Sequence, residues 1–107
     1  MCALKRLLWW LLASSSGGFN RARIIKELTD TPRNANELAT ILNLDYKTTR
    51  HHLRVLEKNN LINPLGKGYG KVYLPSNLIE ENMDLFNNIW QEFEKKINKK
   101  KLNGDKR

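Results

Sequence analysis

Cysteine is nearly absent from this chain of 107 residues, which has a single one, Cys2. One thiol cannot form a disulfide within the chain, and it cannot supply the several thiolates of a structural zinc site. The sequence therefore excludes a disulfide-built fold. We expect a reducing, cytoplasmic setting.

Long apolar runs are also missing. The longest, Leu7–Ala13, is far shorter than the roughly 20 residues that cross a membrane. It follows Lys5 and Arg6 and precedes serines, which is also the layout of a short signal peptide. However, leucines recur here at three- and four-residue steps, which favours a core helix over about residues 3–13. We expect no membrane association.

Acidic residues are scarce relative to basic ones. Asp and Glu number 11 and Lys and Arg 19, so the net charge is +8. This excess favours a polyanionic partner, with nucleic acid first and an anionic membrane surface second. A basic surface that serves only solubility is the competing explanation. With 40% apolar residues, the chain is expected to fold as one small domain over residues 1–107.

No catalytic or metal-binding motif is present, so we predict neither an enzyme nor a metal or other cofactor. His51 and His52 are neighbours on a predicted helix and point about 100° apart, which hinders them from sharing one ion. The acidic residues of the last predicted helix lie opposite its apolar stripe, as a solvent face does. They are Glu80, Glu81, Asp84, Glu92 and Glu94.

The middle of the chain predicts three helices. Asn20 is predicted to cap the first, with Phe19 and Ile24 as a hydrophobic staple, and Thr31-Pro32 should end it. Asn34 and Glu37 match a capping box at the start of the second. The spacing 35, 38, 39 and 42 gives that helix one apolar face.

A turn at residues 43–45 leads to the third of these helices, which Asp45 should cap and Asn59-Asn60 should end. Thr49, Leu53 and Leu56 share a face that should point inward. A short helix, a tight turn and a longer helix with an exposed basic face are typical of a helix-turn-helix DNA reader. The predicted DNA contacts on this helix are Tyr46, Lys47, Thr48, Arg50, His51 and Arg54. A merely solvated cationic face is the competing interpretation.

Two short extended runs, 61–65 and 71–74, flank a glycine-rich turn and predict a β-hairpin. Val72 and Leu74 should face the core. The tip should lie along the DNA backbone or minor groove beside the recognition helix. The predicted DNA contacts of this hairpin are Lys67, Tyr69 and Lys71.

Residues 20–75 resemble a winged helix-turn-helix domain of the ArsR-like transcription regulator superfamily, most closely its archaeal branch. The resemblance rests on four stretches, 20–25, 36–39, 44–53 and 60–62, together with the Gly-Tyr-Gly turn. It implies a mainly α fold with a small β-hairpin, in which the core at about 19–75 is flanked by terminal helices. It also implies that residues 44–59 hold the recognition helix and that the terminal helices form a homodimer. The chain lacks the cysteine pair and the carboxylate-histidine set of the metal-sensing members, so metal-triggered release is not expected.

The last predicted helix, about 77–99, should be capped by Asn77 and Glu80, and it carries an apolar stripe at heptad spacing. Phe86, Trp90 and Phe93 exceed what a small core needs, which favours pairing with a second copy. The residues predicted to form the dimer interface are Leu4, Leu7, Leu8, Leu11, Ile79, Met83, Phe86, Trp90, Phe93 and Ile97.

The leading hypothesis is therefore a homodimeric, sequence-specific regulator of double-stranded DNA. The alternative is a protein-interaction module that docks a partner through its apolar terminal helices, with Trp9, Trp10 and Trp90 as anchors. A peripheral membrane role through residues 7–12 is a more distant one. The sequence does not define the operator, the sign of regulation, an effector, or which terminal helix dominates the interface.

Overall fold

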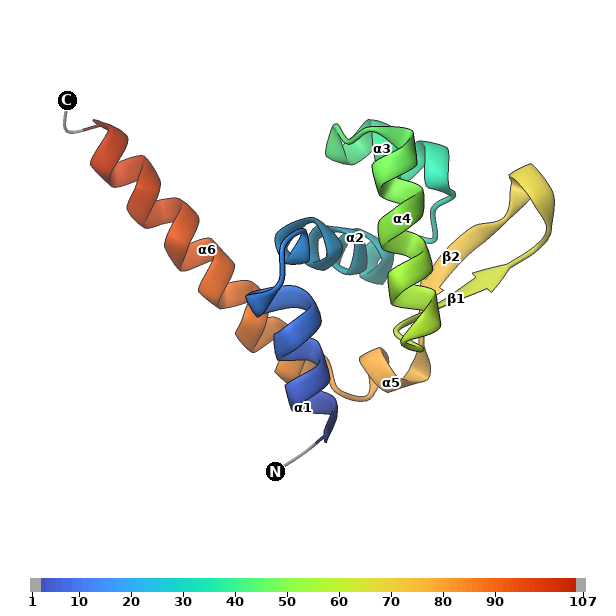
Figure 1. The fold of residues 1–107 in the computed structure, drawn as a ribbon, viewed down its shortest axis with the longest axis horizontal. Helices are drawn as coiled ribbons and strands as arrows, with labels where there is room; N and C mark the ends of the chain where they lie inside the picture. The colour runs from blue at the N-terminus through green and yellow to red at the C-terminus, as the bar shows by residue number, and fades with distance from the viewer. Residues whose placement is uncertain (1–2, 106–107) are drawn as a thin grey trace.

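The computed structural model describes residues 3–105, and the surroundings of side chains from 3 to 99 except that of Tyr69. Cys2 and the side chain of Tyr69 therefore lie outside the described part. The elements in chain order are α1 (Ala3–Leu8), the π-helix η1 (Trp9–Ser14), α2 (Gly18–Asp30), α3 (Ala35–Leu42), α4 (Tyr46–Lys58), β1 (Ile62–Leu65), the 3₁₀ turn η2 (Gly68–Gly70), β2 (Val72–Pro75), α5 (Asn77–Glu80) and α6 (Met83–Asp105). This arrangement confirms the predicted mainly helical fold with a small hairpin (Figure 1).

Local signals fix the turn between α3 and α4. Asn34 and Glu37 form the predicted capping box, with Glu37 N donating to Asn34 Oδ1 at 2.8 Å and Asn34 N to Glu37 Oε1 at 2.9 Å. Asn43 ends α3 in the left-handed conformation, at φ 55°, which asparagine tolerates. Asp45 then caps α4, as predicted.

The β-hairpin is antiparallel and pairs Ile62 with Pro75 and Leu65 with Val72. The predicted inward positions are wrong by one residue. Tyr73 is buried, whereas Val72 and Leu74 are only half-buried. Tyr73 N donates to Arg33 O at 2.8 Å, which pulls the Tyr73 side of the strand onto the α2–α3 junction. Because side chains alternate along a strand, both predicted core residues then leave the inner face.

The start of α2 also differs from the prediction. The helix begins at Gly18, after Gly17 turns the chain at φ 81°. Asn20 therefore lies inside the helix, where its Oδ1 accepts from Arg23 rather than capping. Phe19 does not staple Ile24, because its ring stacks against aromatic rings of α6. The glycine turn at Gly17 is the actual start signal.

The C-terminal segment was predicted as one helix but is broken into α5 and α6. Ser76 rather than Asn77 caps α5, since the Ser76 hydroxyl accepts from Ile79 N at 3.3 Å. The remainder, α6, runs outward from the body of the fold toward the C-terminus (Figure 1). A serine one residue upstream thus overrides the expected cap pair.

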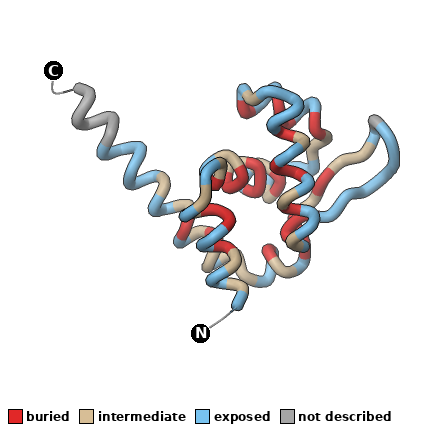
Figure 2. The backbone as a smooth tube through the Cα atoms, viewed as in Figure 1, coloured by how far each residue is buried: buried red, intermediate tan, exposed pale blue. Residues whose placement is uncertain are grey.

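The hydrophobic core joins the terminal segments to the helix-turn-helix. One buried cluster contains residues of the N-terminal segment, α4 and α6. Among them are Leu8, Leu12, Leu53, Leu56 and Phe86. Buried stretches, red in Figure 2, occur on the N-terminal segment, on α2, on α4 and near the start of α6. Phe86, which was expected to be surplus to the core, is completely buried within it. The terminal helices therefore help to complete the fold of the single chain.

Candidate nucleic-acid interface

Helix α4 separates into the two faces that its sequence predicts. Thr49, Leu53 and Leu56 are buried. The predicted contacts Tyr46, Lys47, Thr48, His51 and Arg54 are exposed, and Arg50 is half-buried. The structure therefore brings the six predicted residues of α4 onto the outer side of one helix. Whether they touch DNA stays a prediction.

The first turn of α4 is held by Asp45. Its carboxylate accepts from Thr48 N at 2.9 Å and from the Thr48 hydroxyl at 3.1 Å. The hydrogen bonds from Thr48 are the main reason why the pKa of Asp45 is lowered, and the charge of Lys47 adds to them. Because the Thr48 hydroxyl donates to Asp45, its oxygen lone pairs remain for an outside donor. Thr48 is thus suited to accept from a base amino group rather than to donate to a phosphate.

Arg50 is linked to the hairpin through a residue that the sequence reasoning missed. Its Nη1 donates to the hydroxyl of Tyr73 in β2 at 3.2 Å. Tyr73 is 2% exposed, and Lys71 Nζ lies 5.4 Å from the centroid of its ring. The hairpin prediction placed Tyr73 on the outer face, so the sequence offered no signal for this contact.

The hairpin, called the wing below, turns at residues 66–70. Gly66 and Gly68 have φ of 94° and 60°, values that favour glycine. Lys67 is exposed at this tip and Lys71 is half-buried. The predicted contact Tyr69 has no described side chain, so its role stays a prediction.

An open groove of about 310 Å³ separates the wing from the helix-turn-helix. Its walls carry cations, amides and phenol groups. The lining residues are Asn34, Ala35, Asn36, Tyr46, Arg50, Gly68, Lys71 and Tyr73. Two of the predicted wing and helix cations, Arg50 and Lys71, therefore border the same groove.

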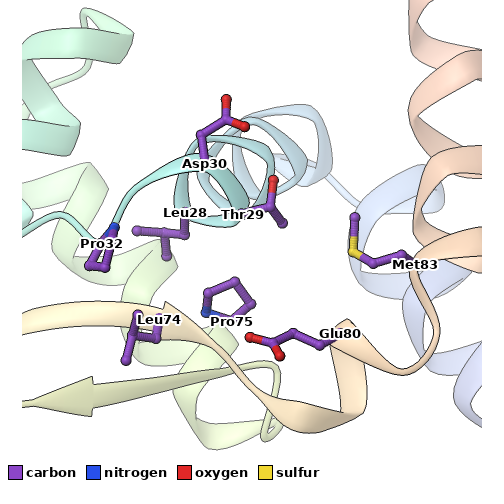
Figure 3. A pocket seen from close by; sticks show the side chains of 8 residues that line it. All are labelled: Leu28, Thr29, Asp30, Pro32, Leu74, Pro75, Glu80 and Met83. Carbon is purple, nitrogen blue, oxygen red and sulfur yellow. The ribbon is translucent and has the colours of Figure 1, made fainter.

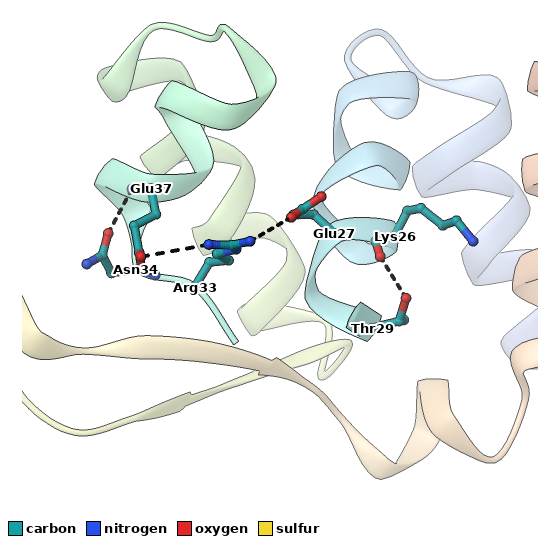
Figure 4. A network of polar contacts seen from close by, with 6 residues as sticks. All are labelled: Lys26, Glu27, Thr29, Arg33, Asn34 and Glu37. Atoms are coloured by element: carbon teal, nitrogen blue, oxygen red, sulfur yellow. Dashed lines mark hydrogen bonds and ion pairs between the residues drawn. The ribbon is translucent and has the colours of Figure 1, made fainter. Parts of the chain in front are cut away.

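A network of polar contacts joins the end of α2 to the start of α3 (Figure 4). Arg33 lies between Glu27 of α2, at 3.4 Å, and Glu37 of α3, at 4.0 Å. Its carbonyl accepts from Tyr73 N. Ion pairs this exposed contribute little energy each. Their geometric effect is to tie α2, α3 and β2 at one point.

His52 lies on the inner side of α4 and contacts Arg21 of α2. Arg21 Nη1 and His52 Nδ1 are 3.3 Å apart, and Arg21 also donates to Leu11 O at 2.9 and 3.1 Å. Burial lowers the pKa of His52, and the charges of Arg21 and His51 lower it further. Burial also lowers the pKa of Arg21. His52 therefore packs against the scaffold, whereas its neighbour His51 is exposed.

A second groove, of about 460 Å³, lies between the end of α2, β2 and the α5–α6 break (Figure 3). Leu28, Leu74, Pro75 and Met83 give it apolar walls, and Glu80 adds a carboxylate. The groove forms where three segments that are distant in the sequence meet, so no local pattern in the sequence predicts it. Within the described residues, no three His, Cys, Asp or Glu side chains are grouped as a metal ion would require.

The residues predicted for the dimer interface do not form one open surface in the single chain. Leu8, Leu11, Ile79 and Phe86 are buried in the protomer's own core. The half-buried members are Leu4, Leu7, Met83, Trp90 and Phe93. Ile97 is exposed (42%). Trp9 (47%) and Trp10 (63%) on η1 are exposed too. Among the described residues, no helix has the length and apolar character needed to cross a bilayer.

Comparison with known families decides what this arrangement is. Residues 20–63, from α2 to β1, match the family model described as "Bacterial regulatory protein, arsR family". This segment is an ArsR-family helix-turn-helix. The ArsR-like resemblance stated from the sequence is therefore confirmed over residues 20–63, and β1 and β2 are the wing of the winged helix-turn-helix fold. A search of curated proteins gives no match.

Solved structures of regulators share the fold of this chain. Staphylococcus aureus MarR in complex with salicylate and kanamycin aligns with a TM-score of 0.62 at 17% identity, over 91% of this chain and 65% of that one. The chain thus spans less than two thirds of that MarR protein. An ArsR-like transcriptional regulator from Rhodococcus sp. RHA1 aligns with a TM-score of 0.59 at 18% identity, over 100% and 99%.

A third similar structure is a Staphylococcus aureus MepR mutant bound to an oligodeoxyribonucleotide. It aligns with a TM-score of 0.59 at 16% identity, over 88% of this chain and 70% of that one. At these identities the likeness concerns the fold alone. The family match covers α2 to the start of β1, and the described chain has the fold of a winged helix-turn-helix.

Proposed function

We propose that this protein is a sequence-specific regulator of double-stranded DNA that acts as a homodimer. In this proposal α4 enters the major groove and the wing lies on the flanking backbone or minor groove. The observation that carries it is the outer face of α4 in an ArsR-family domain, where Tyr46, Lys47 and His51 project beside the half-buried Arg50. Such a helix can present hydroxyl, cationic and imidazole groups to base edges.

Charge and scaffold support the same assignment. A net charge of +8 favours binding to phosphates through release of counterions. The capped turn at Asp45 and the buried Thr49, Leu53 and Leu56 hold α4 rigidly on the core. A rigid helix reads bases with a smaller entropic cost than a mobile one. We assign base contacts to the first turns of α4 and a phosphate contact to Arg54.

The terminal segments support the dimer. Trp9, Trp10 and Ile97 leave large apolar side chains in water, which is typical of an interface. Leu8, Leu11, Ile79 and Phe86 support that surface from inside the protomer rather than contacting the second copy. A two-fold pair would place two α4 helices about 34 Å apart, one DNA turn.

Selection of random duplexes at near-physiological salt, with the mass in solution measured in parallel, tests the proposal. We expect an enriched palindrome and a dimer mass. Arg50→Ala should weaken binding to the enriched site, while Lys67→Ala should mainly lower the salt slope by about one. Lys26→Ala, the same loss of charge on α2, is the control and should leave site preference unchanged. Normal site preference in Arg50→Ala would contradict the assignment of α4.

The exposed Trp9 and Trp10 also favour a second candidate, a module that docks a different protein through η1. The same experiment distinguishes the two candidates. A monomeric mass with weak, sequence-blind DNA binding would favour the docking module and exclude the regulator.

A further inference from the structure

Tyr73 lies where the wing meets the helix-turn-helix. The residue is 2% exposed, and its N–H donates to Arg33 O at 2.8 Å. It pairs with Pro64 across the hairpin. The backbone of Tyr73 is therefore tied to the loop between α2 and α3 and to β1, and its side chain belongs to the buried core cluster. This leaves the hydroxyl at a defined position beside α4.

That hydroxyl is paired with a cation of the proposed DNA surface rather than with a core group. It accepts from Arg50 Nη1 at 3.2 Å. The ring also faces a second cation, because Lys71 Nζ lies 5.4 Å from its centroid. One fixed phenol thus contacts a cation from each of the two elements assigned to DNA. Both cations border the groove between α4 and the wing.

An arginine bound at one terminal nitrogen retains the rest of its fork for another acceptor. Among the hydrogen bonds of the described residues, that to Tyr73 is the one that holds the Arg50 guanidinium. Without this hydrogen bond, the Arg50 side chain would sample several rotamers in the free protein. It would lose that freedom on binding DNA, which lowers the affinity. We infer that Tyr73 is a positioning residue that fixes the Arg50 guanidinium at the groove and thereby sets base discrimination by α4. This inference rests on the proposed function.

Tyr73→Phe tests it, because phenylalanine keeps the buried ring and removes only the hydroxyl. Discrimination between the enriched duplex and single-base variants would be measured in the full chain. We expect Tyr73→Phe to lower discrimination about three- to tenfold, the cost of immobilising one long side chain. The loss should be confined to the base pair that Arg50→Ala also affects. The midpoint of thermal unfolding should change little.

Combined variants separate positioning from a structural role. Tyr73→Phe should cause no further loss in an Arg50→Ala background but the full loss in an Arg54→Ala background, the matched control on the same helix. An equal loss in both backgrounds would show a structural role and overturn the inference. Tighter, unselective binding by Tyr73→Phe would overturn it too, because the hydroxyl would then hold Arg50 away from DNA.

The proposed function and this inference fail in different ways. If the unaltered protein enriches no duplex, both are refuted. If it enriches a duplex and Tyr73→Phe discriminates as well as the unaltered protein, the inference alone is refuted and the regulator assignment stands.

Discussion

At Gly18, where α2 begins, the chain lies very close to the backbone of η1. A Cβ placed there would lie 2.1 Å from Leu12 O, 2.7 Å from Leu12 C and 3.1 Å from Leu11 O. All three atoms belong to the backbone of η1, so no side-chain rotation relieves the clash. The segment would have to withdraw by about 1 Å to reach ordinary contact distance.

The magnitude follows from two opposing effects of Gly18→Ala. Alanine favours the helix and restricts the unfolded chain, which together contribute up to about 1 kcal/mol of stability. Overpacking costs about 1–3 kcal/mol and more where backbone must move. The clash with backbone therefore outweighs the gain. We expect a net loss of about 1–2 kcal/mol in the free energy of unfolding, or a melting temperature lower by roughly 5–10 °C.

Thermal and urea unfolding followed by circular dichroism measure this difference. Gly70→Ala is the control, because a Cβ there meets nothing within 4 Å. The control should unfold with unchanged or slightly higher stability. A Gly18→Ala protein as stable as the unaltered one would refute the reasoning that η1 and α2 are locked in contact.

Two further predictions concern pH and the attachment of α6. The lowered pKa of His52 means that its contribution to stability is complete above its unfolded-state pKa of about 6.5 and is lost as the pH falls through its lower folded-state pKa. Urea titrations at about pH 7.5 and about pH 5 should show this loss, and His52→Gln should reduce it. Phe19 stacks on Trp90 at 6.3 Å and lies 5.1 Å from Phe93. A double-mutant cycle of Phe19→Ala and Trp90→Ala should give a coupling of about 0.5–1.5 kcal/mol, and a coupling near zero would exclude this stacking as an anchor of α6.

Local signals were sufficient for the centre of the fold. The capping box at Asn34, the left-handed Asn43 and the cap at Asp45 each act within a few residues, so sequence spacing alone locates them. The buried face of α4 follows from helix periodicity. These are the elements that position the predicted DNA contacts, and they were predicted well.

Long-range contacts explain the failures. Tyr73 turns inward because its N–H meets Arg33, a residue far away in the sequence. The ring of Phe19 packs against aromatic rings of α6 instead of a residue of its own helix. The hydrogen bond between Arg50 and Tyr73 likewise joins residues that are far apart in the sequence. Periodicity reports which side of an element is apolar, but it does not report which partner that side meets.

The outward course of α6 has a consequence for how order is distributed in the chain. From Glu94 to Lys99 every residue is exposed, whereas Phe86 and Ile89 near the start of the helix are buried. A short helical stretch without tertiary contacts is marginal in water, since few of its hydrogen bonds are supported by packing. In a single protomer, amide protection against hydrogen exchange should therefore decline along α6 from Phe86 outward. The local stability of α6 is therefore high where the helix packs on the core and low where it extends into solvent.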